Sequence, residues 1–176
     1  MTEHKYTSND DCIVSIEEQT EIVSWLRENY LRLRKNGFNR YVGFLHEIQN
    51  IPKVIWDIKQ RVVEKEKLYG EKQEPLFRDV IGYMFDGAQL HEHSDPNVGN
   101  LIHTRFNVYV QLPEVGGHPI YDKKTLRLKE RTYICCKAGI DKHYAEKCEG
   151  KRERVILSYG FLLPYERINN IVYEYD

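Results

Sequence analysis

The stretch QLHEHSDPN, residues 89–97, gathers imidazole and carboxylate side chains immediately before a Pro-Asn turn. Residues two apart in a strand point to the same side, so His93 and Asp95 can converge on one point while Ser94 faces away. His143 follows fifty residues later, before another predicted strand. Two histidines and one carboxylate with open coordination positions form the facial triad that binds non-heme Fe(II). An HxD sequence alone is a common chance match, so the triad is a hypothesis that needs further support.

Around this stretch, from about Asp79 onward, the sequence has the pattern of a β-protein. Short runs rich in Val, Ile, Tyr and Thr are separated by Gly, Pro and Asp, and several alternate with period two. The runs are VIGYMF, the segment around QLHEH, HTRFNVYVQLP, HPIYD, TLRLK, RTYICC, RVILSYGFLLP and INNIVYEYD. Their spacing of about ten residues predicts a β-sandwich or jelly roll.

The first part of the chain, residues 1–78, has a different pattern and is predicted to be helical. Ser15 and Glu18 have the spacing of a capping box, and the apolar residues that follow recur every three or four positions. Because Asn and Gly often follow the last turn of a helix, we expect this helix to end at Asn36-Gly37.

Two further helices are expected before the β part begins. One starts at about Arg40 and the other at Pro52, where apolar residues fall on one helical face. The sequence contains no low-complexity linker and no internal repeat. We therefore expect one domain over residues 1–176, with a helical part to about residue 78 and a β-core over about 79–176, braced by two or three helices.

The charge, hydropathy and cysteine content of the chain disfavour several functional classes of protein. The chain carries 26 Lys and Arg against 27 Asp and Glu, for a formal net charge of −1. Nucleic-acid binders and electrostatic membrane binders usually have a basic excess, so both classes are disfavoured. The sequence contains no run of 18 apolar residues, which is the length needed to span a membrane. The initial MTEHKYTSNDD lacks the apolar core of a signal peptide. The four cysteines show no CxxC spacing, so we expect a reduced, cytoplasmic protein.

Two arginines support the metal-site hypothesis. Arg152 and Arg154 follow His143 at the edge of the predicted strand RVILSYGF. A buried arginine there could bind a carboxylate through two parallel N–H bonds.

Four blocks of the sequence together resemble a known family. GAQLHEHSDPN, HTRFNVYVQLPEVGG, His143 and GKRERVILSYGFLLP occur in the order found in the 2-oxoglutarate- and Fe(II)-dependent oxygenases. The spacing is most similar to the aspartyl/asparaginyl β-hydroxylase and prolyl 4-hydroxylase branches. The resemblance covers roughly residues 79–164 and implies a double-stranded β-helix core, which is jelly-roll and cupin-like.

The resemblance implies roles for the triad and for one arginine. His93, Asp95 and His143 would be the iron ligands. Arg154 would bind the distal carboxylate of 2-oxoglutarate, by its match to the aspartyl hydroxylases. Arg152 instead matches the spacing of the prolyl hydroxylases, so the choice between the two arginines stays open, with Arg154 preferred.

Three more cosubstrate-binding residues follow from the same resemblance. Arg105 matches a second arginine that helps to hold the cosubstrate in the aspartyl hydroxylases, and Asn107 lies where those enzymes have a histidine. Tyr83 lies near the position of a tyrosine that contacts the distal carboxylate in prolyl hydroxylases, although it is displaced by one residue.

The implied function is hydroxylation of an unactivated C–H bond with Fe(II), 2-oxoglutarate and O2. The expected substrate is an amino acid, a peptide or another small molecule, and succinate and CO2 are the coproducts. A non-catalytic cupin-like protein that binds a metal or a ligand is the alternative, and dealkylation of nucleic acid is disfavoured by the neutral charge.

The remaining histidines and charges allow more ordinary interpretations. His91 shares a strand face with His93 and could replace it as a ligand or line the substrate pocket. His103 and His118 are expected to be structural residues at strand ends or in loops. Glu92 and the basic stretch KKTLRLKER are expected to face solvent.

Overall fold

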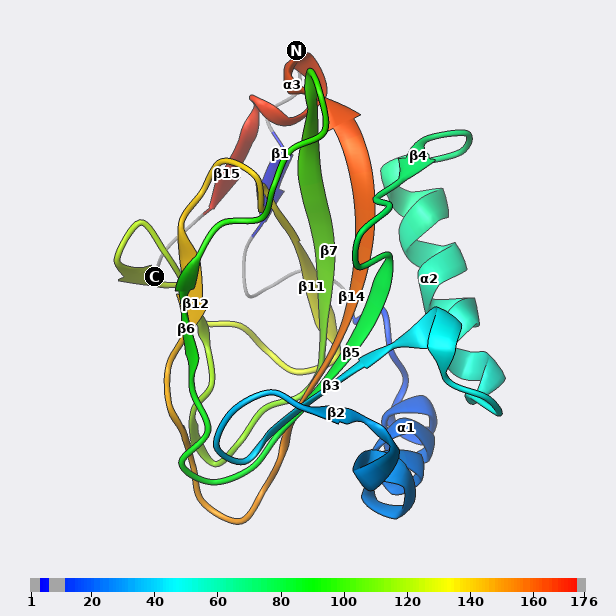
Figure 1. The fold of residues 1–176 in the computed structure, drawn as a ribbon, viewed down its shortest axis with the longest axis vertical. Helices are drawn as coiled ribbons and strands as arrows, with labels where there is room; N and C mark the ends of the chain where they lie inside the picture. The colour runs from blue at the N-terminus through cyan, green and yellow to red at the C-terminus, as the bar shows by residue number, and fades with distance from the viewer. Residues whose placement is uncertain (1–3, 7–11, 174–176) are drawn as a thin grey trace.

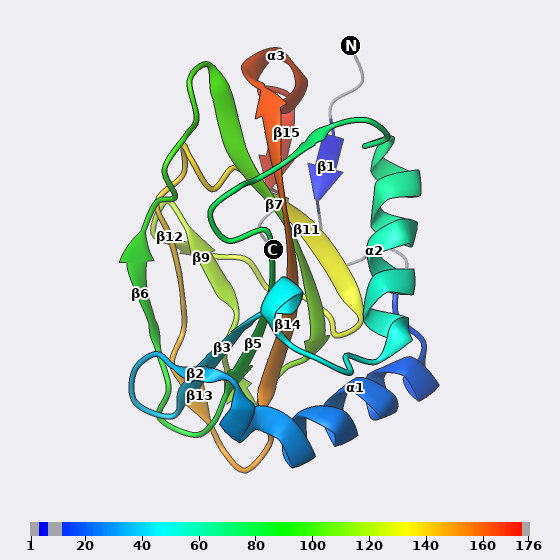
Figure 2. The same cartoon turned by 45° about the vertical axis from the view of Figure 1, so that its right-hand side comes forward.

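Two β-sheets face one another, and two long helices pack against the outer side of the larger sheet (Figures 1 and 2). The computed structural model describes residues 4–6 and 12–173. Within these residues, no helix is long and apolar enough to cross a membrane.

The large sheet contains the longest strands of the molecule. In order across the sheet, these are β11 (Thr132–Cys136), β7 (Leu101–Gln111), β14 (Arg154–Pro164), β5 (Asp79–Met84), β3 (Arg40–Phe44) and β2 (Arg34–Lys35), and β4 (Lys72–Gln73) also pairs with β14. All of these pairs are antiparallel.

A smaller sheet covers one face of the large sheet. Its order is β10 (Lys124–Thr125), β9 (Pro119–Tyr121), β12 (His143–Ala145) and β6 (Leu90–His93), again antiparallel. Two short pairs complete the strands, namely β8 (Val115–Gly116) with β13 (Cys148–Glu149), and β1 (His4–Tyr6) with β15 (Ile171–Tyr173). A mainly β chain with a few helices is thus confirmed, and the facing antiparallel sheets fit a jelly-roll-like arrangement.

The helices cover the face of the large sheet that points away from the small sheet. They are α1 (Ile16–Asn29) and α2 (Lys53–Glu66). The short α3 (Tyr165–Ile168) instead follows the end of β14 (Figure 1), and one-turn 3-10 helices lie at Tyr30–Arg32 and Leu45–Glu47. The predicted capping box is present, because Ser15 accepts from the Glu18 backbone N–H and the Glu18 side chain accepts from that of Ser15.

The core lies between these helices and the large sheet. Buried apolar residues of α1 and α2 supply the helical side: Ile22, Val23, Leu26, Val54, Ile55, Ile58 and Val62. Each such side chain contributes about 1.5–3 kcal/mol when it is fully buried. Tyr159 of β14 reaches this layer and donates from its hydroxyl to the Ile55 carbonyl at 2.6 Å. Because side chains alternate along a strand, the neighbouring Ser158 faces the small sheet instead.

The predicted helix from Arg40 was wrong, because Arg40–Phe44 is strand β3. The first helix also ends at Asn29, before the expected Asn36-Gly37. Asn36 and Gly37 instead lie in the turn between β2 and β3, where Gly37 has a φ of 114° that a side chain would disfavour. An Asn-Gly pair signals a hairpin as readily as a helix end, and the Tyr and Val that follow favour a strand.

Smaller differences concern strand lengths. Of TLRLK, only Thr125 lies in a strand, at the end of β10, and INNIVYEYD forms strand at Ile171–Tyr173, while residues 174–176 lie outside the described part of the chain.

Candidate metal centre and pocket

His93 and His143 are brought together by the pairing of two strands of the small sheet. They are direct partners in the register between β6 and β12, and their ring centroids lie 4.3 Å apart. Asp95 follows β6, and its Oδ1 lies 4.0 Å from His93 Nε2. One donor atom from each of the three residues lies within 4.8 Å of the other two. Within residues 4–6 and 12–173, no other group of three or more such side chains could hold a metal.

Backbone carbonyls set the tautomer of both imidazoles. His93 Nδ1 is 2.8 Å from the carbonyl of His91, and His143 Nδ1 is 3.0 Å from the carbonyl of Asp141. A carbonyl oxygen only accepts, so each Nδ1 carries a proton, and Nε2 is the nitrogen that offers a lone pair in the neutral ring. Metal-binding histidines are commonly oriented in this way.

Burial keeps His143 in the form that binds metals. Burial of the ring is the main cause that lowers the pKa of His143, and the nearby His93 lowers it further. The hydrogen bond to Asp141 and the charge of Asp95 oppose this shift without reversing it. The His93 side chain is 39% exposed and that of Asp95 is 12% exposed, so the centre is reached from one side.

A buried charge network lies behind Asp95. His103 Nε2 lies 3.6 Å from Asp95 Oδ2 and 3.6 Å from Glu74 Oε2, and it accepts a 2.9 Å hydrogen bond from Arg105. Burial, and then the positive charge of Arg105, lower the pKa of His103. Glu74 is fully buried, and its carboxylate also accepts hydrogen bonds from the backbone N–H groups of Phe77 and Arg78. The expectation that His103 is structural agrees with this packing.

Arg105 uses its whole guanidinium within the protein. Its Nε donates to Ser158 Oγ at 2.7 Å, and its Nη1 faces His103 and Glu74. Its Nη2 donates to the carbonyls of Arg78 and Ser158. These contacts engage all five N–H donors of an arginine, which leaves none for a cosubstrate.

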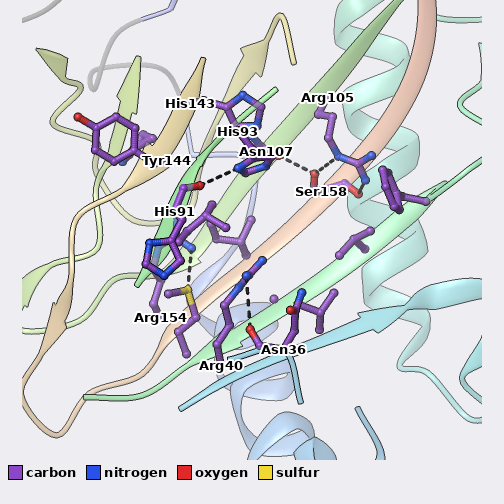
Figure 3. Close-up of a pocket in the computed structure, with 18 of the residues that line it drawn as sticks. Asn36, Arg40, His91, His93, Arg105, Asn107, His143, Tyr144, Arg154 and Ser158 are labelled. Atoms are coloured by element: carbon purple, nitrogen blue, oxygen red, sulfur yellow. Dashed lines mark hydrogen bonds between the residues drawn. The ribbon is translucent and has the colours of Figure 1, made fainter. Parts of the chain in front are cut away.

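A pocket of about 480 Å3 lies between the two sheets, beside the triad (Figure 3). Alternate residues of β7 and β14 form its floor, as the strand period requires: Arg105, Asn107 and Tyr109, and Arg154, Ile156 and Ser158. Asn107 therefore faces the pocket as expected, and its Oδ1 accepts a 2.6 Å hydrogen bond from Ser158.

The two candidate arginines have different surroundings. Arg154 is 5% exposed and lines the pocket, where its Nε donates to the Gly117 carbonyl at 2.6 Å and its guanidinium lies 5.6 Å from the Tyr109 ring. Arg152 lies outside the pocket and forms a two-point ion pair with Glu130. Of these two candidates, only Arg154 lines the pocket beside His93, Asp95 and His143.

Tyr83 lies on the other face of the large sheet. Its hydroxyl donates to Glu153 Oε1 at 3.0 Å, and its ring packs against Tyr30 and Phe85. The residues on either side of it, Gly82 and Met84, line the pocket. The predicted cosubstrate role of Tyr83 does not fit this geometry, because the displacement by one residue reverses the direction of a strand side chain.

The remaining predicted residues lie at the rim or outside. His91 and Glu92 line the pocket and are exposed, and Glu92 lies 3.6 Å from Lys142. His118 does not line the pocket and accepts from the Leu128 N–H at 3.2 Å. His91 therefore belongs to the rim, and it contributes its carbonyl to the orientation of His93.

Sequence reasoning missed several pocket residues. Tyr109 and Tyr121 line the pocket and are each 1% exposed, and burial raises both of their pKa values above 10. The alternation that pairs Arg105 with Asn107 would have predicted Tyr109. Arg40 also lines the pocket, and it was missed because its segment was interpreted as a helix.

Comparison with solved structures shows which proteins have a similar fold. A 2OG-Fe(II) oxygenase family oxidoreductase from Burkholderia pseudomallei aligns over 92% of this chain and 95% of its own, with a TM-score of 0.59 and 13% identity. A viral collagen prolyl hydroxylase from Paramecium bursaria Chlorella virus-1, in complex with 2-oxoglutarate, aligns over 88% and 93% at a TM-score of 0.63 and 15% identity. This chain has the fold of the 2-oxoglutarate- and Fe(II)-dependent oxygenases.

A third solved structure extends the comparison. HygX from Streptomyces hygroscopicus, with nickel, 2-oxoglutarate and hygromycin B bound, aligns over 88% of this chain and 81% of its own, with a TM-score of 0.61 and 9% identity. No known family and no curated protein matches the sequence itself. The predicted resemblance to these oxygenases is confirmed at the level of the fold.

Proposed function

We propose that the protein is an Fe(II)- and 2-oxoglutarate-dependent dioxygenase that hydroxylates a C–H bond, built on a double-stranded β-helix core. The observation that carries the proposal is the convergence of His93, Asp95 and His143 in a pocket that also contains the buried Arg154. The solved structure of the viral prolyl hydroxylase, which has a similar fold, contains 2-oxoglutarate, and that of HygX contains 2-oxoglutarate with nickel, which supports the cofactor assignment.

The donor set fits Fe(II). Two imidazoles and one carboxylate are the ligands of the facial triad, and the Nδ1 contacts with backbone carbonyls leave both Nε2 atoms available to a metal. An Fe(II) ion held there would supply the activation of O2, with one oxygen atom of O2 ending in the hydroxylated product and the other in the succinate that forms, together with CO2, from 2-oxoglutarate. The ligands would be His93, Asp95 and His143.

Arg154 would hold the distal carboxylate of 2-oxoglutarate. It is buried, and its contacts with Gly117 and Met84 leave N–H groups for a two-point bond to a carboxylate. The rings of Tyr109 and Tyr121 would exclude water around that bond, which strengthens it. We assign Arg105 to the wall of the site, where it positions Asp95 through the buried network, instead of to the cosubstrate.

The reacting part of the substrate would be small. The pocket of about 480 Å3 lies toward the low end of the roughly 300–1,000 Å3 typical of small-molecule sites, and the cosubstrate occupies part of it. This size suits an amino-acid side chain, free or in a peptide, or a small molecule.

The cysteines of the described residues are all free, which fits a reducing compartment such as the cytoplasm.

Binding of 2-oxoglutarate to the Ni(II)-loaded protein, measured by calorimetry, tests the proposal. Ni(II) is used because it does not turn the cosubstrate over during the measurement. We expect binding by the wild type and a loss of about 10- to 100-fold in Arg154→Ala, because a charge-assisted pair contributes about 1.5–3 kcal/mol. Arg152→Ala is the matched control and should bind 2-oxoglutarate as the wild type does, because Arg152 faces Glu130.

Turnover provides the second measurement. With Fe(II) and O2, the wild type should form succinate from 2-oxoglutarate even without a substrate, at a slow rate. His143→Ala should lose metal binding while its circular dichroism spectrum stays native. Wild-type protein that binds a metal but neither binds nor converts 2-oxoglutarate would favour the cupin-like binding protein.

A further inference from the structure

The mouth of the pocket lies between the edges of the two sheets. On the small sheet, β6 is the edge strand and contributes His91 and Glu92. On the large sheet, the β2–β3 hairpin forms the edge and contributes Asn36 and Arg40. A substrate that enters between these edges meets Arg40 before it reaches the centre.

Arg40 and Arg154 lie on one line across the large sheet. Arg40 pairs with Met84 in the register of β3 with β5, and Met84 pairs with Arg154 in the register of β5 with β14. Residues aligned in this way point to the same face, and both arginines line the pocket (Figure 3). Arg154 belongs to the inner strand β14 and is 5% exposed, whereas Arg40 is two strands nearer the edge and only partly buried.

The carboxylates in and around the pocket pair with other side chains, and none of them pairs with Arg40. Arg105 is offset by Glu74, and Glu92 lies 3.6 Å from Lys142. The Arg40 side chain has one hydrogen bond, a 3.4 Å contact from Nη1 to the Asn36 carbonyl, and no carboxylate within ion-pair distance among the described residues. Its Nε and Nη2 groups therefore remain as a free fork of donors.

We propose that Arg40 binds a carboxylate group of the substrate, so that the enzyme acts on a carboxylate-bearing molecule. This inference rests on the proposed function. In that function, the charges of Fe(II), Asp95, doubly ionised 2-oxoglutarate and Arg154 cancel. One positive charge remains, on Arg40, and one monoanionic carboxylate on the substrate neutralises it.

The surroundings of Arg40 favour such a bond. Burial lowers the pKa of Arg40, and the positive charge of Arg154 lowers it further, so the ionised form is less stable there than in water. A bound carboxylate relieves both effects. An arginine fork binds a carboxylate in one orientation, which fixes the C–H bond that faces the metal.

The experiment compares probes that differ only in one charge. Ni(II)- and 2-oxoglutarate-loaded protein is titrated with a set of N-acetyl amino acids and with the corresponding N-acetyl amino amides, by ligand-observed NMR. We expect at least one carboxylate to bind at least about tenfold more tightly than its amide in the wild type. Arg40→Gln should abolish this preference, and Arg40→Lys should keep part of it because the charge remains.

Arg34→Gln is the matched control on the same hairpin. Arg34 is 64% exposed, pairs with Glu47 and does not line the pocket, so its variant should keep the preference. Affinity for 2-oxoglutarate is measured in every variant and should stay within about threefold of wild type in Arg40→Gln.

Three results would overturn the inference. The first is that no carboxylate of the set binds at about 10 mM, or that amides bind equally well. The second is an unchanged preference in Arg40→Gln. The third is a loss of 2-oxoglutarate affinity in Arg40→Gln as large as that in Arg154→Ala, which would assign Arg40 to the cosubstrate. Binding of 2-oxoglutarate to the wild-type protein is measured before any probe is added. Failure to bind it would contradict the proposed function itself and not only this inference.

Discussion

Glu153 and Arg154 are neighbours in sequence, yet their side chains serve opposite faces of the large sheet. Arg154 faces the pocket, whereas Glu153 forms a two-point ion pair with Arg27 of α1 and accepts from the Tyr83 hydroxyl. Burial by itself would raise the pKa of Glu153, but hydrogen bonds from Arg27, from the backbone and from Tyr83 outweigh it and lower the pKa to about 2. The ion pair thus attaches α1 to the strand that carries Arg154.

Replacement of Glu153 should therefore give a pH-dependent loss of stability. Because the folded-state pKa lies below the ordinary value of 4.5, the ionised carboxylate stabilises the fold above pH 4.5, and this contribution is lost as the pH falls toward 2. Arg27 is 57% exposed, so solvent screens the pair, and we expect Glu153→Gln to cost about 1–2 kcal/mol at pH 7.

Urea unfolding at several pH values measures this contribution. The difference in unfolding free energy between wild type and Glu153→Gln should shrink between pH 5 and pH 2. Glu21→Gln, at an exposed position of α1, is the control and should differ little from wild type at any pH. A difference that stays constant with pH would mean that the variant acts through packing instead of through the charge.

At this scale, the sequence predicted side-chain chemistry better than side-chain direction. The closeness of His93 and Asp95 could be predicted because the HxD spacing places the two residues on one strand face. Tyr83 was misassigned because a shift of one residue moves a strand side chain to the opposite face. The engagement of Arg105 with Glu74 and Ser158 depends on contacts between distant segments, which no local pattern contains.

At the scale of elements, strand β14 lies so close to the loop after β4 that position 160 has no room for a side chain. Gly160 of β14 donates from its N–H to the Arg78 carbonyl at 3.1 Å, and its carbonyl accepts from the Glu74 N–H at 3.2 Å. A Cβ at Gly160 would lie 2.7 Å from the Arg78 carbonyl oxygen and 2.9 Å from Arg105 Nη1. This close approach holds Glu74 and Arg105 in contact behind the metal centre.

Gly160→Ala should therefore destabilise the protein. Forcing a methyl group into a filled site typically costs about 1–3 kcal/mol, which lowers the melting temperature by roughly 2–12 °C for a chain of this length. Gly82→Ala is the matched control, because a Cβ at Gly82 meets nothing within 4 Å. Thermal unfolding followed by circular dichroism makes the comparison, and equal melting temperatures would show that the loop moves aside at little cost.

The β2–β3 hairpin shows where local pattern was insufficient at the scale of elements. Asn36-Gly37 fits either a helix end or a hairpin turn, and the residues next to it do not decide between the two. Pairing of β3 with β5, forty residues further on, decides between them. Long-range partners of this kind are not encoded near the turn, whereas the capping box of α1 is local and was predicted correctly.

The whole molecule brings together residues that are remote in the chain, so occupation of the site should stabilise the entire fold. The proposed ligands come from both sheets, since β6 and β12 provide the triad histidines and β14 provides Arg154. A ligand that binds only the folded state at 100 times its Kd adds about 2.7 kcal/mol to the stability. For a chain of this length, that corresponds to a rise of roughly 5–10 °C in melting temperature.

The sharper expectation is that the two ligands act together. 2-Oxoglutarate bound through both the metal and Arg154 should raise the melting temperature strongly when Ni(II) is present and only slightly in EDTA. His143→Ala should lose the shift given by the metal and most of the shift given by 2-oxoglutarate, whereas His46→Ala, outside the pocket, should keep both. Differential scanning fluorimetry with and without each ligand measures these shifts. Equal stabilisation by 2-oxoglutarate with Ni(II) and with EDTA would mean that the cosubstrate binds away from the triad, because a shared site requires the two shifts to depend on each other.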